Sequence, residues 1–273
     1  MSTEEVVGSV EALWRYPVKS MLGERLQSAV VTERGLLGDR AYALVDRLTG
    51  HLGSTKNPRK WGFLLECKAR FGRPLKADEP LSPAMITLPD GTRIETDQPA
   101  ARELLSKALG REVTIAYGGT EKPTVEKYWP EVGSVDHRNE LTCEAIVENT
   151  FFDGDPVHLL TRGSLKALST HYPSGLFDAR RFRPNIVVYT PPERWSFVEN
   201  DWVGHTIAIG PQVLFHIKRP TRRCVITTLA QGELPRDLGI LKTAAQYNAA
   251  SVGVYAEVIR GGIISEDDQV VLS

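Results

Sequence analysis

Residues 213–229 read VLFHIKRPTRRCVITTL, and this stretch decides the fold class. Two runs rich in β-branched and other apolar side chains, residues 213–217 and 225–229, flank a loop that carries Pro220, several arginines and Cys224. Short apolar runs bounded by turn residues are typical of β-strands. We therefore expect Cys224 to lie where a loop enters a strand.

The same pattern recurs along the whole chain. Three helices are predicted: one from an N-cap at Asp97 to an end at Gly110, one near residues 164–170 and one near 237–248. Many short strands with few helices indicate a mainly β protein with peripheral helices, built from β-barrel-like units and not from a parallel βαβ sheet. The predicted strands are residues 6–14, 26–31, 41–45, 63–71, 84–88, 92–95, 157–160, 186–189, 206–209, 213–217, 225–229 and 252–259.

A chain of 273 residues can form one large domain or two smaller ones. Residues 118–140 are polar and rich in turn residues, which is typical of a joint between lobes. We place the division between a first lobe, residues 1–120, and a second lobe, residues 121–273.

Composition excludes several classes of protein. Lys and Arg total 33 and Asp and Glu total 34, so the net charge of −1 argues against a nucleic-acid-binding surface. The N-terminus lacks the pattern of a signal peptide, and no apolar run approaches the roughly 18 residues of a membrane helix. Cys67, Cys143 and Cys224 form no CxxC pair, which argues against a disulfide framework or structural zinc and favours a reducing, cytoplasmic location.

Cys224 has the most informative surroundings of the three cysteines. Arg222 and Arg223 precede it directly, and neighbouring cations favour the thiolate, which is both the nucleophile and the soft-metal ligand. The local sequence is equally compatible with a half-buried structural cysteine beside solvated arginines, and it leaves both readings open.

Four further clusters place charged or hydroxyl side chains at the ends of predicted elements. Basic side chains bind anions, and a helix N-terminus attracts phosphate because its first N–H groups are free. Taken singly, each cluster is more typical of a solvated loop, but together they could surround one large anionic ligand if the fold brings them to one place. Their candidate residues are Lys19 and Ser20 in residues 16–20, Arg40 in residues 35–40, Ser164 in residues 161–164, and Arg183 and Asn185 in residues 180–185.

Other polar residues carry weaker signals. The six histidines show no metal-ligand spacing, and His158 and His216 lie in apolar runs, where a structural role is expected. The glycine pairs lack the strand–GxGxxG–helix context of a Rossmann loop. Asp153 and Asp155 flank a glycine, which is typical of a turn.

Taken in combination, these motifs resemble one known family over nearly the whole chain. Residues 16–20 (YPVKS) and 35–40 (GLLGDR) resemble the MOSC N-terminal β-barrel domain. Residues 182–185 (FRPN), 223–228 (RCVITT) and 264–272 (ISEDDQVVL) resemble the MOSC domain itself. The resemblance implies a MOSC N-terminal lobe in residues 1–120 and a MOSC domain in residues 121–273.

The resemblance also implies a molybdenum–molybdopterin cofactor between the two lobes, and no pyridoxal phosphate. Cys224 matches the family's metal-ligating, catalytic cysteine, and a thiolate suits a metal that also binds dithiolene sulfurs. An anionic, phosphorylated pterin requires cationic and N–H donors. The residues that match the family's cofactor contacts are Lys19, Ser20, Arg40, Ser164, Arg183 and Asn185, and Arg223 is added to them as the neighbour of Cys224.

Members of this family reduce N-hydroxylated compounds, so the resemblance implies an oxidoreductase with such a small-molecule substrate. Clustered cysteines for an iron–sulfur centre are missing from this sequence, so a separate ferredoxin- or cytochrome-type protein is expected to donate electrons. Residues 229–232 (LAQG) replace the Asp-Pro of the amidoxime-reducing members, which leaves the substrate range open. A non-redox cofactor-binding, carrier or sulfur-transfer protein that uses the same cysteine is the alternative, and a β-barrel interaction module without cofactor is a third.

Overall fold

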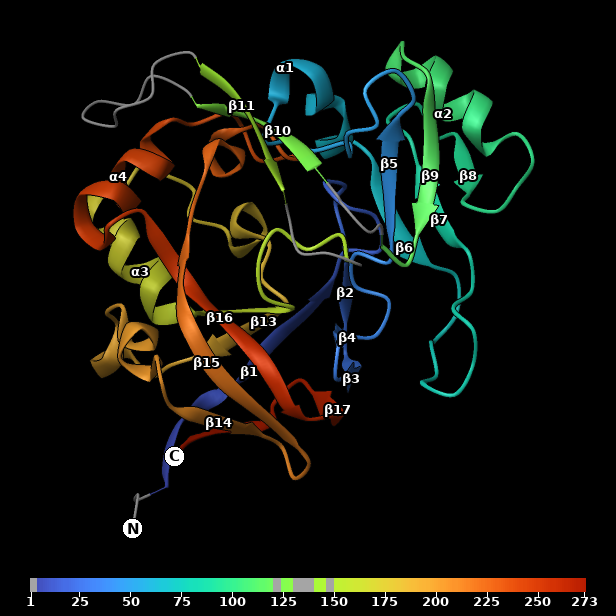
Figure 1. Cartoon of the computed structure of the whole chain (residues 1–273). Helices are drawn as coiled ribbons and strands as arrows, with labels where there is room; N and C mark the ends of the chain where they lie inside the picture. The colour runs from blue at the N-terminus through green and yellow to red at the C-terminus, as the bar shows by residue number, and fades with distance from the viewer. Residues whose placement is uncertain (1–3, 120–123, 130–139, 146–149) are drawn as a thin grey trace.

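A computed structural model describes residues 4–119, 124–129, 140–145 and 150–273 (Figure 1). Seven strands close into a barrel, in which only the β12–β13 pair is parallel among the described pairings. The barrel confirms the mainly β fold class. In order around the barrel the strands are β1 (Glu5–Arg15), β13 (Ile186–Tyr189), β12 (Val157–Thr161), β16 (Ser251–Arg260), β15 (Val213–Arg222), β14 (Thr206–Ile209) and β18 (Gln269–Leu272).

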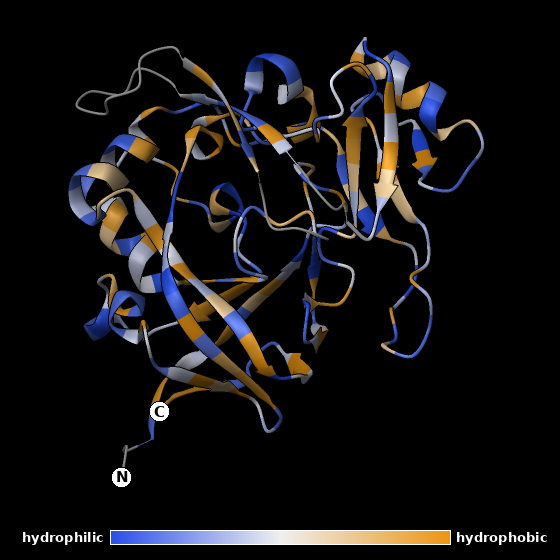
Figure 2. Cartoon of the chain, viewed as in Figure 1, coloured by the Kyte–Doolittle hydropathy of each residue, from blue (hydrophilic) through white to orange (hydrophobic). Residues whose placement is uncertain are grey.

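The barrel interior is filled by the apolar side chains that the alternating sequence pattern directs inward. Figure 2 shows apolar and polar residues alternating along β15 and β16. Val10, Phe215 and Val254 are fully buried there, and burial of each such side chain contributes roughly 1.5–3 kcal/mol. Gly253 has φ 81°, and a Cβ there would lie 2.4 Å from the His158 ring, so a glycine is required where β16 passes β12.

Outside the barrel, the elements from β5 to β11 pack a core of their own (Figure 1), and from here on the name first lobe means these elements, although β10 and β11 lie beyond residue 120. Leu44, Trp61 and Ile86 lie at the centre of that core, each almost completely buried. Its elements are β5 (Tyr42–Asp46), α1 (Pro58–Trp61), β6 (Lys68–Phe71), β7 (Ala84–Thr87), β8 (Arg93–Glu95), α2 (Ala101–Leu109), β9 (Val113–Tyr117), β10 (Thr124–Trp129) and β11 (Glu140–Ala145). The short strands β2 (Glu24–Leu26), β3 (Ser28–Thr32), β4 (Gly35–Leu36) and β17 (Gly262–Ser265) lie beside the barrel strands, and side chains of β3, β4 and β17 pack into the barrel core.

Helices α3 (Arg162–His171) and α4 (Gly239–Asn248) lie together on the side of the barrel away from the first lobe (Figure 1). Both helices were predicted from the sequence, and so was the end of α2 at Gly110, which has the left-handed conformation. The predicted N-cap at Asp97 is wrong, because a turn through Pro99 delays the start of α2 to Ala101. Among the described residues, no helix is both long enough and apolar enough to cross a membrane.

Two of the predicted strands are wrong in part or in whole. Residues 225–229 are not a strand: Val225–Thr228 form the 3₁₀ turn η5, because threonine hydroxyls bond back to the preceding carbonyls and compete with sheet pairing. Within the predicted strand 63–71, Gly62–Leu65 form the 3₁₀ turn η1, and only Lys68–Phe71 pair as β6.

The predicted joint at residues 118–140 contains strand β10, whereas its residues 120–123 and 130–139 lie outside the described part of the chain. Strand β10 pairs with β11 and bridges to Leu52, while β1 belongs to the barrel. The division between residues 120 and 121 stays a prediction.

Candidate functional site

Cys224 caps the N-terminal end of η5 and is half-buried with a free thiol. Its carbonyl accepts hydrogen bonds from the amide and the hydroxyl of Thr227, at 3.2 and 3.1 Å. The neighbouring Arg223 turns inward: its guanidinium donates to the Phe182 carbonyl at 2.7 Å, and its amide donates to the Ala250 carbonyl at 2.7 Å. The cysteine therefore lies on a tightly bonded turn beside a cation.

Tyr16 is enclosed by two guanidinium groups from distant parts of the chain. The Cζ atoms of Arg40 and Arg183 lie 4.4 and 4.3 Å from the centre of its ring, within the range of a cation–π contact. Arg40 also forms an ion pair with Asp39 and donates to the Arg183 carbonyl at 3.3 Å. Arg183 donates to the Met21 carbonyl at 2.7 Å. The fold thus brings together Arg40 and Arg183, two of the residues predicted from the sequence.

Lys19, a third predicted residue, belongs to a buried lysine pair that the sequence did not reveal. Its Nζ lies 2.6 Å from Asp153 Oδ1 and 2.9 Å from the Phe151 carbonyl, and the same carboxylate oxygen lies 3.1 Å from Lys56 Nζ. Burial lowers the pKa of Lys19 to about 8, although Asp153 opposes the shift. The expectation that Asp153 only forms a turn is wrong, because its carboxylate bridges two buried ammonium groups.

Lys56 connects this lysine pair with the cysteine. Burial acts to lower its pKa, but the opposing charges of Asp153 and of Cys224 outweigh burial and raise it. Lys56 lies in a short loop between β5 and α1, where its sequence neighbours give no sign of a functional role.

We use the name cationic cluster for Lys19, Lys56, Arg40, Arg183 and Arg223. The cluster contains five cations, and the carboxylates bonded to it are Asp39 and Asp153, so the described residues leave an excess of 5 − 2 = 3 positive charges. Burial, together with the charge of Arg40, lowers the pKa of Arg183 to about 10. Buried charges of one sign are costly unless they are compensated. The cluster therefore fits an anionic ligand.

Several buried polar atoms around the cluster lack a hydrogen-bond partner among the described residues. They are Tyr16 Oη, Thr55 Oγ1 and Arg223 Nε. Burial raises the pKa of Tyr16 to about 12, so its hydroxyl stays a neutral donor at pH 7. Such orphan groups are rare in native proteins and require an explanation. A bound ligand with hydrogen-bonding oxygen or nitrogen atoms is one such explanation.

The backbone is strained at three of the predicted residues. Ser20, Arg40 and Arg183 have φ of 69°, 47° and 55°, and the described residues contain only three other non-glycine positions with positive φ. Each such position costs roughly 1–3 kcal/mol, and strain of this kind concentrates at functional sites. The Ser20 hydroxyl accepts a hydrogen bond from the Thr55 amide at 3.1 Å, so it fixes the loop that carries Lys56.

Two predicted residues form no described side-chain bond to a member of the cationic cluster. Asn185 accepts from the His158 amide at 3.1 Å and donates to the Trp14 carbonyl at 3.3 Å, which ties β1 to β12. Ser164, fully buried, donates to Glu199 at 2.6 Å beneath the start of α3. Direct cofactor contact by these two residues stays a prediction.

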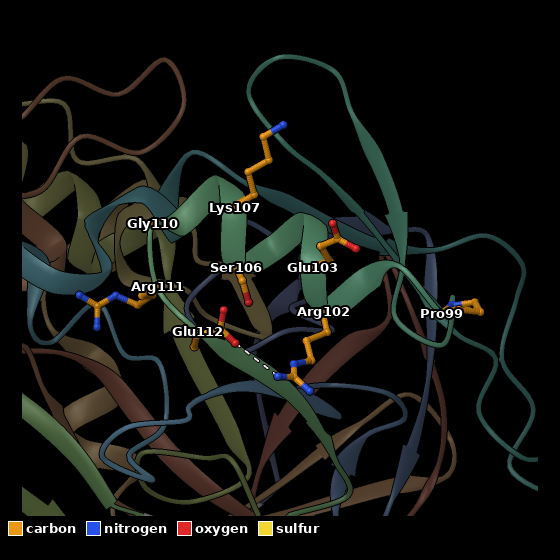
Figure 3. A pocket seen from close by; sticks show the side chains of 8 residues that line it. All are labelled: Pro99, Arg102, Glu103, Ser106, Lys107, Gly110, Arg111 and Glu112. Atoms are coloured by element: carbon orange, nitrogen blue, oxygen red, sulfur yellow. Dashed lines mark hydrogen bonds and ion pairs between the residues drawn. The ribbon is translucent and has the colours of Figure 1, made fainter.

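Two surface cavities in the described part of the chain are lined by other residues. One, of about 760 Å³, runs along α2, where Arg102 bonds to Glu112 at 3.3 Å and Lys107 points outward (Figure 3). A second, of about 410 Å³, lies between β2, β3 and residues 71–75. Neither lining contains Cys224 or a member of the cationic cluster.

Comparison with known families matches two regions of the chain. Residues 147–271 match the model of the MOSC domain, and residues 7–68 match the MOSC N-terminal beta barrel domain. The first match includes η5 and Cys224, and the second includes Lys19, Ser20, Arg40 and Lys56.

Individual relatives are distant. Mitochondrial amidoxime reducing component 2 of Rattus norvegicus is 24% identical over 236 residues, which cover 82% of this chain and 67% of that protein. The crystal structure of the YuaD protein from Bacillus subtilis is similar over 100% of this chain and 98% of that one, with a TM-score of 0.50 and 11% identity. YiiM from Geobacillus stearothermophilus matches 44% of this chain and 54% of its own, at 19% identity and a TM-score of 0.33. The similarity to YuaD indicates that the two proteins share a fold.

Proposed function

The chain belongs to the MOSC family, and from this premise we propose that it is a molybdenum-cofactor-binding oxidoreductase that reduces N-hydroxylated compounds. MOSC domains are associated with binding of the molybdenum cofactor. The reaction class comes from the distant rat relative, whose name describes an amidoxime reducing component. A separate ferredoxin- or cytochrome-type electron donor and a cytoplasmic location complete the proposal.

The observation that carries the proposal is the excess of positive charge near Cys224, made by the buried Lys19, Lys56 and Arg183 and the half-buried Arg40 and Arg223. Lys19, Arg40, Arg183 and Arg223 would hold the phosphate and the pterin, and Cys224 would ligate the metal. When bound, the cofactor would supply two electrons and a site for the oxygen atom of the substrate.

The chain's own residues prepare this site. Lys56 and Arg223 supply positive charge around the position of Cys224. The neutral Tyr16 hydroxyl offers a hydrogen bond from between two guanidinium groups. The overall reduction converts R–NH–OH, two electrons and two protons into R–NH₂ and water, so the site must admit protons as well as electrons.

A direct test is to purify the protein from a host that makes the cofactor and to measure bound molybdenum by mass spectrometry. Turnover of an amidoxime is then measured with a reduced viologen dye as artificial donor. We expect stoichiometric molybdenum and amidine formation. Bound molybdenum without turnover of any amidoxime or N-hydroxylated base would favour the carrier or sulfur-transfer role, and absence of molybdenum would favour an interaction module.

A further inference from the structure

Every backbone carbonyl from Cys224 to Leu229 accepts a hydrogen bond. Within the turn, Thr227 bonds to the Cys224 carbonyl, and the Thr228 hydroxyl bonds to the Val225 carbonyl at 2.8 Å. The Asp237 amide bonds to the Thr228 carbonyl at 2.8 Å. The remaining three carbonyls, of Ile226, Thr227 and Leu229, accept from the side chains of Gln231 and Arg181. The turn that carries the Cys224 thiol is therefore held by bonds within itself and by bonds from residues outside it.

Arg181 is fully buried, at 0% exposure, and its guanidinium donates to backbone carbonyls only in the bonds that the structure describes. The acceptors are the carbonyls of Leu176 at 2.8 Å, Thr227 at 3.5 Å, Leu229 at 3.2 Å and Pro235 at 2.8 Å. These bonds tie the end of η5 to the segment before η2 (Ala179–Phe182) and to Pro235 in the loop that follows η5. A planar fork with five N–H groups can serve four acceptors in this way, whereas a lysine ammonium has three.

Gln231 completes the arrangement. Its Nε2 donates to the Ile226 carbonyl at 3.0 Å and to the Arg181 carbonyl at 3.4 Å, and it is almost fully buried. The same short turn η2 also places the Phe182 carbonyl on Arg223 and the Arg183 side chain on Tyr16. Turn η2 therefore contacts both the turn that carries Cys224 and two members of the cationic cluster.

We propose that Arg181 and Gln231 form a clamp that positions the Cys224 thiol towards the cationic cluster. The clamp consists of positioning residues, since both act on the backbone of η5 and touch neither the thiol nor the ligand site. Its importance for metal binding rests on the proposed function, but its effect on the thiol does not.

The test uses Arg181→Lys and Gln231→Met, with Arg180→Lys as the matched control. Arg180 is the sequence neighbour of Arg181 but lies at the surface, where it pairs with Asp178 and Glu233. The probe is iodoacetamide, applied to protein without cofactor, and labelling is measured peptide by peptide. Cys67, which is 1% exposed, serves as an internal reference for general loosening of the fold.

In Arg181→Lys, we expect Cys224 to be labelled roughly ten times faster, because loss of a charge-assisted bond shifts local opening by about this factor. Gln231→Met is expected to raise the rate less, since it removes a neutral donor. Labelling of Cys67 should be unchanged in both variants, and Arg180→Lys should behave as the wild type. In protein loaded with cofactor, the Mo(V) EPR spectrum of Arg181→Lys should become heterogeneous.

A folded Arg181→Lys variant that labels Cys224 at the wild-type rate would overturn the clamp. Equal acceleration at Cys67 and Cys224 would also overturn it, because this result indicates general destabilisation. If Arg181→Lys does not fold, Gln231→Met decides by the same criteria. The labelling result stands even if the protein binds no molybdenum, so failure of the clamp and failure of the proposed function are distinguishable.

Discussion

At the scale of single residues, the side chains of the cationic cluster carry like charges and repel one another. Burial and the charges of Lys56 and Arg40 lower the pKa of Lys19, and Asp153 is the main group that opposes the shift. Such an arrangement costs folding free energy in the absence of an anionic ligand. Ligand binding would recover that cost, so stability and ligand binding should be coupled.

Cys224→Ser is expected to leave the fold intact and to abolish both molybdenum retention and reductase activity, because a serine hydroxyl does not replace a soft thiolate. Metal content and turnover measure the two effects. Cys67→Ser and Cys143→Ser are the controls, since neither cysteine has a bond to the cationic cluster in the described structure. Full molybdenum content and full turnover in Cys224→Ser would refute the assignment.

Because the pKa of Lys19 changes on folding, the free energy of unfolding of the cofactor-free protein should depend on pH. Its pKa falls from 10.5 to about 8 on folding, so the unfolded chain binds more protons between these values and stability rises with pH there. Lys19→Met should lose this rise, which amounts to at most about 3 kcal/mol. Urea unfolding from pH 7.5 to 10.5 measures it.

Lys107→Met, at an exposed position on α2, is the control and should keep the wild-type slope. A Lys19→Met variant with the same slope as the wild type would mean that Lys19 is not the group responsible.

At the scale of elements, the local sequence pattern predicts where the strands lie, but it does not predict that residues 225–228 form a turn. Alternation and turn residues were sufficient to predict six of the seven barrel strands and helices α3 and α4, whereas β18 was expected only from the family resemblance. The β-branched residues 225–229 fit a strand equally well by composition, and only the two threonine hydroxyls favour the turn. Side-chain-to-backbone bonds of this kind compete with sheet pairing but leave no periodic signal in the sequence.

The residues of the candidate site likewise fall into two groups, those that a local motif predicts and those that only the structure reveals. Arg40, Lys19 and Arg183 were predicted because each lies in a recognisable motif, and the fold brings Arg40 and Arg183 into contact. Lys56 and Asp153 were missed, since each is a single charge in a loop whose partner lies 97 residues away (153 − 56 = 97). Only tertiary packing reveals such a pair.

Thr228→Val tests the structure of η5. It leaves the buried Val225 carbonyl without its hydroxyl donor, which should cost about 1–3 kcal/mol of unfolding free energy in a urea titration. Thr170→Val is the matched control, because the Thr170 hydroxyl makes an equivalent bond to the Lys166 carbonyl on the exposed face of α3. Equal losses in both variants would argue against a special role for the turn.

At the scale of the whole molecule, the site is an interface between the barrel and the first lobe. Arg40 meets Arg183 across this boundary, and Lys19 and Lys56 meet Asp153. Each contact joins segments that are far apart in the chain, so the site forms only when both lobes are folded and docked. A bound anion between them would stabilise the docked arrangement.

In the proposed reaction, electrons must reach this interface from a separate donor. Arg222 is exposed next to Cys224, whereas Arg223 points inward to the Phe182 carbonyl. An exposed arginine beside the proposed metal ligand favours a donor with an acidic face, and such transient contacts are small, below about 1,200 Å².

We therefore expect turnover with an acidic iron–sulfur donor to fall as ionic strength rises from about 0.01 to 0.3 M, a range over which screening removes long-range attraction. Arg222→Glu should reduce kcat/KM for that donor roughly tenfold at low salt and less at high salt. Arg102→Glu, at an exposed position on α2, should have no such effect, and turnover with viologen should be unaffected in both variants. Salt-independent turnover would contradict electrostatic docking. Turnover with reduced nicotinamide alone would contradict the need for a protein donor, because electrons would then reach the site without any docked partner.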